Sequence, residues 1–290
     1  MNAIHPWRSL ALAGIGVLAL AAPLHAAPSA QAAWTAVGAA GKLAIDDGGP
    51  RGGSTLPPVL FVHSYAGSSA HWKSALEHLR RTRRAVAFDF RGHGRSAAPP
   101  DNQTGEWAID RIAADVGAVA DALGLGRFVI VGHSMGGSIA ASYAGRHPDR
   151  VAGLVVVGTP GKAPPEMAAQ VLEGLRADYD KAMGAYWQSL LKNAKPATKK
   201  GREAEMKRLS KEQSMALIEA TFAFDPLPAI GRYPGPKLII DTEGGESAAA
   251  LHEQLPQVER RLIPRTSHWV QLDDPKAFED VLDQFLAKVG

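Results

Sequence analysis

Short runs of apolar residues alternate with amphipathic segments along most of the chain. The segments 59–62, 85–90 and 128–131 are nearly continuous apolar runs, which is the pattern of strands buried on both faces. Helices are predicted between them, at 69–79 and at 106–123, and the second has apolar residues at helical spacing. This alternation predicts an α/β fold with a mostly parallel β-sheet flanked by helices on both faces.

The alternation is interrupted once. A helix at 135–146 and a strand at 154–157 are followed by residues 161–233, which have helical periods and many charges but no buried strand. The alternation then resumes, with strands and helices predicted at 237–240, 248–254, 258–263 and 275–289. We therefore expect an α/β core formed by residues 33–160 and 234–290, with an inserted α-helical cap at 161–233 that selects the substrate.

The first 32 residues are predicted to be a signal peptide. Arg8 precedes an apolar run, Leu10–Ala22, and small residues follow, with cleavage predicted after Ala26 or after Ala32. The run is shorter than the ~20 residues of a membrane-spanning helix. Export to the periplasm or out of the cell is therefore favoured, and a retained anchor is the alternative.

Composition limits the kinds of nucleophile, cofactor and partner that the chain is expected to use. Of the 290 residues, 46% are hydrophobic and 21% charged, which suits a folded chain with one large core. The net charge is +3 and the charges are scattered except at Arg80–Arg84 and Lys192–Lys211, which does not favour a nucleic-acid partner. The absence of cysteine excludes disulfides and a Cys nucleophile. Since no metal or nucleotide motif is present, no cofactor is predicted, and the expected partner is a small-molecule substrate.

A G-x-S-x-G motif carries the strongest chemical signal. It occupies Gly132–Gly136, directly follows the apolar run 128–131 and opens a predicted helix. In this strand-turn-helix context the motif forms a nucleophile elbow, whose tight turn needs glycine on both sides and pushes the serine hydroxyl outward. Ser134 is therefore the predicted nucleophile. The alternative is that Ser134 only caps the helix.

Several segments together resemble the α/β-hydrolase fold, in particular its capped, serine esterase-like members. They are the elbow and the segments His63–Ser68, Asp89–Ser96 and Ser267–Trp269, and the resemblance covers roughly residues 58–290. The resemblance implies the family order of nucleophile, acid and histidine. A serine needs a neutral imidazole to take its proton, and the resemblance implies His268 as this general base, since it lies between the last strand and the last helix.

The acid of the triad departs from the family pattern. The turn after the strand 237–240 has Gly245 where the resemblance implies an aspartate. Glu246 is the nearest carboxylate in register and is our first candidate. Asp241, the first polar residue after the strand, is the alternative, and Glu243 or no acid at all remain open.

The oxyanion hole is expected to use two backbone N–H groups. One belongs to Met135, which follows the nucleophile, and the resemblance implies the other in the loop after 59–62. Ser64 stands there in place of the usual glycine, and we assign the donor to Tyr65. The Gly-rich turn Arg91–Gly94 is interpreted as structural, and Lys192–Lys211 as the solvated face of cap helices.

These residues predict a serine hydrolase that cleaves an ester, thioester or lactone through an acyl-enzyme. The same site used for perhydrolysis, for aminopeptidase action or for carbon–carbon bond hydrolysis is an alternative, as is a non-catalytic ligand-binding protein. Apolar cap residues predict a pocket of modest size: Met167, Val171, Leu172, Leu175, Met183, Tyr186 and Trp187. Activity is predicted to rise through about pH 6 to 7 as His268 loses its proton.

Overall fold

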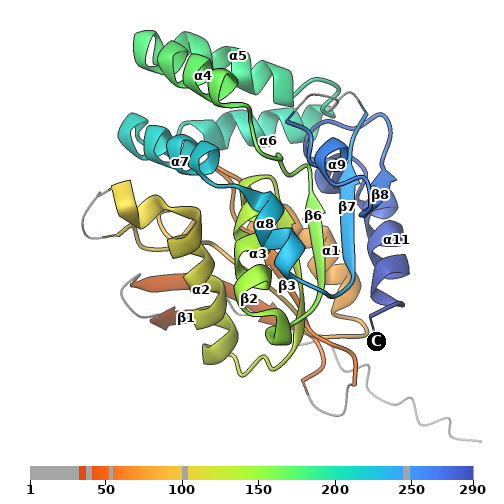
Figure 1. Ribbon diagram of the computed structural model, residues 1–290. Helices are drawn as coiled ribbons and strands as arrows, with labels where there is room; N and C mark the ends of the chain where they lie inside the picture. The colour runs from red at the N-terminus through yellow and green to blue at the C-terminus, as the bar shows by residue number, and fades with distance from the viewer. Residues whose placement is uncertain (1–32, 37–40, 52–54, 100–103, 244–248, 290) are drawn as a thin grey trace, which may run out of the picture.

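The computed structural model describes residues 33–36, 41–51, 55–99, 104–243 and 249–289. An eight-stranded sheet with the order β1-β2-β4-β3-β5-β6-β7-β8 runs through its centre (Figure 1). The strands are β1 (Ala33–Ala36), β2 (Lys42–Gly48), β3 (Val59–Val62), β4 (Ala85–Phe88), β5 (Phe128–His133), β6 (Val151–Val157), β7 (Lys237–Asp241) and β8 (Glu259–Leu262).

The sheet is parallel except at one edge. β1 pairs with β2 and β2 with β4 in antiparallel register, whereas β4, β3, β5, β6, β7 and β8 all pair in parallel. Parallel strands need crossover connections. Helices supply them: α1 (Lys73–Leu79), α2 (Ile109–Ala122), α3 (Met135–Arg146) and α9 (Leu251–Gln254), with α10 (Val270–Asp273) and α11 (Pro275–Leu286) after the last strand. Short 3₁₀ turns are η2 (Ser69–Trp72), η3 (Thr104–Trp107) and η4 (Pro148–Arg150).

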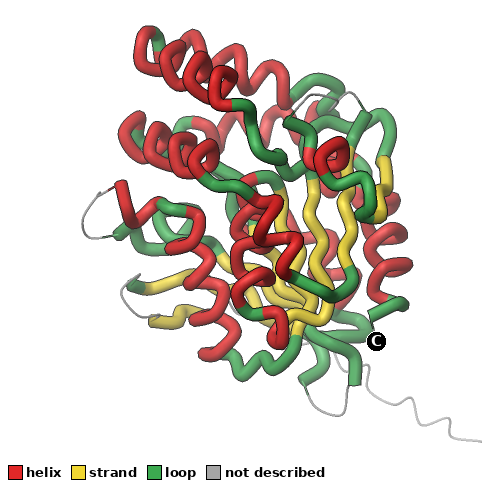
Figure 2. The backbone as a smooth tube through the Cα atoms, viewed as in Figure 1, coloured by secondary structure: helices red, strands yellow, loops and turns green. Residues whose placement is uncertain are grey.

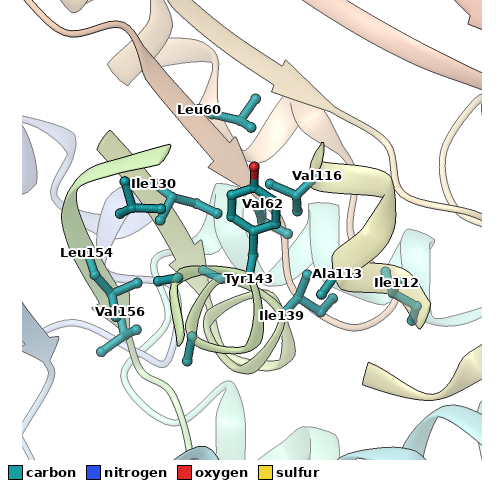
Figure 3. Close-up of a cluster of buried hydrophobic side chains, with 14 of the residues drawn as sticks. Leu60, Val62, Ile112, Ala113, Val116, Ile130, Ile139, Tyr143, Leu154 and Val156 are labelled. Atoms are coloured by element: carbon teal, nitrogen blue, oxygen red, sulfur yellow. The ribbon is translucent and has the colours of Figure 1, made fainter. Parts of the chain in front are cut away.

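Each face of the sheet has its own hydrophobic core, because successive side chains of a strand point to opposite faces. Leu60, Val62 and Ile130 point toward α2 and α3 (Figure 3). Their neighbours Phe61 and Val131 pack on the opposite face with residues of α1 and α11. The predicted sheet covered by helices on both faces is therefore confirmed, and the polar groups at the carboxyl ends of its parallel strands meet at one edge.

A helical insertion separates β6 from β7. Its helices are α4 (Pro165–Ala177), α5 (Tyr179–Leu190), α6 (Pro196–Met206), α7 (Lys211–Ala223) and α8 (Pro226–Arg232). Figures 1 and 2 show α4 to α7 stacked beyond one end of the sheet, and α8 beside α3. Buried residues of α8, Ala229 and Ile230, belong to the same core as α3. We refer to residues 161–233 as the helical insertion.

None of the helices in the described ranges has the length and apolar character needed to cross a membrane. The predicted signal peptide, residues 1–32, lies outside the described residues. Export of the protein therefore stays a prediction.

Candidate active site

Ser134 lies in a sharp turn between β5 and α3. Its backbone has φ 56° and ψ −122°, in the left-handed half of conformational space that residues other than glycine rarely adopt. Its N–H donates to the carbonyl oxygen of Val157 at the end of β6, over 2.7 Å. A strained backbone that the surrounding structure holds in place is common at functional sites, and here it has the form that the G-x-S-x-G motif predicts.

The two flanking glycines are required by close backbone approaches. A Cβ atom added to Gly132 would lie 2.2 Å from the carbonyl oxygen of Gly136, and one added to Gly136 would lie 2.2 Å from the carbonyl oxygen of His63. Both obstacles are backbone atoms, so a side chain at either position would displace the turn. The elbow is therefore packed directly against the loop that follows β3.

The two residues predicted to supply the oxyanion donors line the same cavity as Ser134. Met135 is the first residue of α3, where a backbone N–H has no intrahelical acceptor. Tyr65 lies in the loop after β3, and Ser134, Met135 and Tyr65 line the same cavity of about 510 Å³. Within that loop the N–H of Gly67 donates to the carbonyl oxygen of Ser64 over 3.0 Å. The loop is thus a closed turn despite the serine at position 64.

His268 is anchored from three sides. His133, the residue before the nucleophile, donates from Nε2 to the carbonyl oxygen of His268 over 2.9 Å, and the two imidazole rings have centroids 4.7 Å apart. The N–H of His268 donates to the carbonyl oxygen of Leu190, at the end of α5, over 3.2 Å. Its ring faces Gly158, just after β6, where an added Cβ would lie 3.2 Å from Nδ1. The structure thus brings His268 to the strand end that also holds Ser134.

The partial burial of His268 favours its neutral form. Desolvation lowers the pKa of its imidazole to about 4, because a charged ring loses its hydration there. A neutral imidazole is the form that accepts a proton from serine. The sequence-based expectation of a transition between pH 6 and 7 took the ordinary pKa of histidine, since the covering of His268 by α5 and by the ring of Trp269 is not visible in the sequence.

Of the three carboxylates considered for the triad, the structure describes Asp241 and Glu243. Glu246, the first candidate, lies outside the described residues, so its role stays a prediction. The carboxylate of Asp241, the alternative, lies 3.0 Å from Nδ1 of His252 and 3.1 Å from Nε of Arg260. Asp241 therefore already has two partners. Glu243 is exposed, and its carboxylate accepts a weak bond of 3.3 Å from the N–H of Arg265.

The Gly-rich turn after β4 is structural, as the sequence predicted. The guanidinium of Arg91 makes two hydrogen bonds to Asp115, of 2.8 and 2.7 Å, and a third of 2.7 Å to Glu106. Its charge is thereby satisfied within the protein. His63 accepts a hydrogen bond from the N–H of Phe90 over 3.2 Å, so it fixes this turn relative to the loop after β3.

The cavity at Ser134 is walled by the helical insertion. Val171 and Leu175 of α4 and Met183 and Tyr186 of α5 line it, as the sequence predicted. Met167, which is exposed, and Leu172 do not line it, and Trp187 packs instead against Trp269 with parallel rings 5.6 Å apart. Among the described residues that line the cavity, none carries a charged side chain.

Sequence reasoning missed four polar side chains of the insertion. Arg202 and Glu205, in the stretch interpreted as a solvated face, are each only 7% exposed, so that interpretation is wrong for these two residues. Tyr65 shares a hydroxyl hydrogen bond with Ser214 of α7, which also accepts one of 2.5 Å from Tyr179 of α5. Arg202 and Glu205 are three residues apart, which places both charges on one helix face. This spacing was the signal in the sequence that could have identified the pair.

Comparison with known proteins agrees with this geometry. The family model described as alpha/beta hydrolase fold matches residues 57–194. A putative 2-succinyl-6-hydroxy-2,4-cyclohexadiene-1-carboxylate synthase of Bacillus subtilis (strain 168) is 25% identical over 269 residues, which cover 86% of this chain and 96% of that protein. The sn-1-specific diacylglycerol lipase ABHD11 of Mus musculus is 29% identical over 268 residues, 81% of this chain and 83% of its own.

A solved structure extends the comparison to three dimensions. The enol-lactonase from Burkholderia xenovorans LB400 matches with a TM-score of 0.69 and 25% sequence identity. The match covers 88% of this chain and 100% of the lactonase chain. Together with the turn at Ser134, these similarities show that the chain has the α/β-hydrolase fold.

Proposed function

We propose that this α/β-hydrolase cleaves a neutral carboxylic ester, thioester or lactone through a covalent acyl-enzyme on Ser134. One observation carries the proposal: a serine in a strained strand-to-helix turn opens into an apolar cavity, and the residue before it, His133, packs against His268 with ring centroids 4.7 Å apart. The lipase and the lactonase among the similar proteins support the same class of bond.

In the proposed reaction, Oγ of Ser134 attacks the substrate carbonyl carbon while His268 takes the hydroxyl proton. The N–H groups of Met135 and Tyr65 stabilise the oxyanion of the tetrahedral intermediate. As the bond to the leaving alcohol or thiol breaks, His268 returns the proton to the leaving group. Water then attacks the acyl-enzyme with His268 again as base, which releases the carboxylic acid and restores the hydroxyl. Glu246 is the proposed partner that orients His268.

The lining of the cavity favours a neutral acyl group over a peptide. An aminopeptidase needs a carboxylate to hold the substrate amine, and the acidic residues of α4 and of the start of α5 are not among the described lining residues: Glu166, Glu173, Asp178 and Asp180. Asp178 instead caps α5 by accepting a hydrogen bond of 3.1 Å from the N–H of Lys181. Burying an unpaired ammonium in an apolar cavity would be costly.

The proposal is tested with the purified protein on nitrophenyl acetate, butyrate and octanoate, and on alanine nitroanilide. We expect nitrophenol release from the esters and no release of nitroaniline. A fluorophosphonate probe should add one equivalent of mass, and peptide mapping should place it on Ser134. A folded protein that neither releases nitrophenol nor takes up the probe would be a binding protein, contrary to the proposal.

The shape of the cavity also predicts a substitution that changes the preference for acyl length. Gly174 of α4 lines the cavity, and no atom lies within 4 Å of a Cβ added to it. Gly174→Leu should therefore fill cavity volume without disturbing the helix. We expect kcat/KM for the octanoyl ester to fall about tenfold or more, since each methylene bound in an apolar pocket changes kcat/KM by roughly 10-fold or more. For the acetyl ester we expect kcat/KM to change less than about twofold.

Gly184 of α5 provides the matched control, because an added Cβ there also meets open space and the residue is not among those lining the cavity. Gly184→Leu should leave the ratio of octanoyl to acetyl activity unchanged. Equal ratios in both variants and the wild type would show that the acyl chain binds elsewhere.

A further inference from the structure

A buried carboxylate links the helical insertion to the core. Glu205 of α6 is 7% exposed and accepts a hydrogen bond of 2.8 Å from Nε2 of His71, which is 3% exposed, in the turn η2. The same carboxylate oxygen lies 2.6 Å from a terminal guanidinium nitrogen of Arg202. Glu205 therefore has one neighbour in the core and one on its own helix.

The core neighbour supports the loop that holds the proposed oxyanion donor. The imidazole of His71 lies directly under Gly67, where an added Cβ would be 2.5 Å from its Cε1. Gly67 is two residues after Tyr65, and its N–H closes the loop turn onto Ser64. A change in the orientation of the His71 ring would therefore move the backbone that carries the Tyr65 N–H.

The helix neighbour reaches the loop of the proposed base. The guanidinium of Arg202 lies over the ring of Trp269, 5.9 Å from its centroid, within the range of a cation–π interaction. Trp269 is 1% exposed and follows His268, whose ring meets it edge-on at 5.2 Å. On its other side Trp269 stacks on Trp187 of α5. Arg202 thus holds the indole that packs against the catalytic imidazole.

The charges of this cluster are matched. Burial opposes ionisation of Glu205, but its contacts with His71 and Arg202 outweigh burial and hold the pKa of its carboxyl below the usual range. Burial lowers the pKa of His71, so at neutral pH the ring is an uncharged donor. The cluster therefore contains one buried anion and one buried cation. Removing the anion would leave the Arg202 charge uncompensated in the interior, which is strongly unfavourable.

We infer that Glu205 is a positioning residue, which through His71 and Arg202 fixes the oxyanion loop and the His268 loop relative to each other. The inference rests on the proposed function for its kinetic part. It assigns the helical insertion a role in holding the catalytic geometry in addition to forming the acyl cavity. Both contacts act on loops that carry reacting groups, and neither His71 nor Arg202 lines the acyl cavity. The loss of Glu205 should therefore affect kcat more than KM.

The main test is Glu205→Gln, which keeps the shape of the side chain and removes its charge. We expect kcat for nitrophenyl butyrate to fall about 10- to 100-fold, as for small displacements of catalytic groups, with KM changed less than about threefold. The matched control is Glu219→Gln, which removes an exposed ion pair of 2.7 Å between α7 and Arg176 of α4. Since surface pairs contribute little, this variant should keep the wild-type kcat.

A second readout does not depend on turnover. Hydrogen exchange of the segment 64–68 should be faster in Glu205→Gln than in the wild type and in Glu219→Gln. Should Glu205→Gln fail to fold, His71→Leu replaces it, because this variant leaves the pair between Glu205 and Arg202 intact and breaks the hydrogen bond that links Glu205 through His71 to the oxyanion loop. The same two changes are expected there, a lower kcat and faster exchange at 64–68.

Unchanged exchange at 64–68 in a folded variant, or a lower melting temperature with the wild-type kcat, would overturn the inference. An inactive wild type would refute the proposed function alone, and the exchange measurement would then decide whether Glu205 fixes the loop. Faster exchange at 64–68 with unchanged kcat would show that the loop position does not limit the reaction, and would overturn the positioning role.

Discussion

Replacing Ser134 with alanine should lower kcat for nitrophenyl butyrate by roughly 10⁴- to 10⁶-fold, the usual loss when a serine nucleophile is removed. The hydroxyl is the only group lost, and the cavity and the backbone donor of Met135 remain. KM for the residual reaction should therefore stay within a fewfold of the wild-type value. The measurement is nitrophenol release by identically purified proteins, with phosphonate labelling as a second readout, which Ser134→Ala should abolish.

Ser138 provides the control for this substitution. It lies one turn further along α3, is buried at 2% exposure, and its N–H donates to the carbonyl oxygen of Ser134 over 3.3 Å. Ser138→Ala should keep the wild-type rate, because the backbone bond does not need the side chain. Equal activity of the wild type and Ser134→Ala would show that another group performs the hydrolysis.

The sequence predicts those parts of this fold that are fixed by local patterns. The strands β3, β5 and β6 are buried on both faces and therefore have continuous apolar runs, which single out their positions. The elbow is equally local, since Gly132, Ser134 and Gly136 must be close in sequence to form one turn. The antiparallel pair at the edge, β1 with β2, joins strands that are neighbours in the chain, as is usual for sheets.

Contacts between distant segments were beyond this kind of prediction. The stretch 192–211 has the composition of a solvated surface, and only its packing against the core turns Arg202 and Glu205 inward. His71 lies 134 residues from Glu205, and no pattern in a single sequence joins them. The same holds for the partial burial of His268, which depends on the insertion and shifts its pKa away from the value expected for an exposed ring.

The insertion contacts both sides of the site. From α7, Ser214 bonds the hydroxyl of Tyr65, and Tyr179 of α5 bonds the same serine. At the end of α5, the carbonyl oxygen of Leu190 accepts the N–H of His268. These contacts are made by backbone groups and hydroxyls whose identity is weakly specified by sequence pattern. A role of the insertion in organising the catalytic loops is therefore visible only in the structure.

Glu246→Gln should lower both the rate and the pH at which activity is lost in acid. His268 must be neutral to accept the proton of Ser134, so activity falls as the pH drops through the pKa of the imidazole. Burial alone places this pKa at about 4, and a carboxylate facing the ring raises it by favouring the charged form. We expect the acid limb of kcat/KM to lie above pH 4 in the wild type and near pH 4 in Glu246→Gln.

The loss of kcat at the neutral plateau should be roughly 10²- to 10⁴-fold, because the acid orients the imidazole and stabilises its charged form without forming or breaking bonds itself. Asp241→Asn and Glu243→Gln are the matched controls. Asp241 is engaged by His252 and Arg260, so its replacement should reduce stability and leave the acid limb in place. If the acid limb moves in one of the controls and stays fixed in Glu246→Gln, the role of the acid belongs to that control residue. Coincident pH profiles in the wild type and all three variants would show that His268 works without a carboxylate partner.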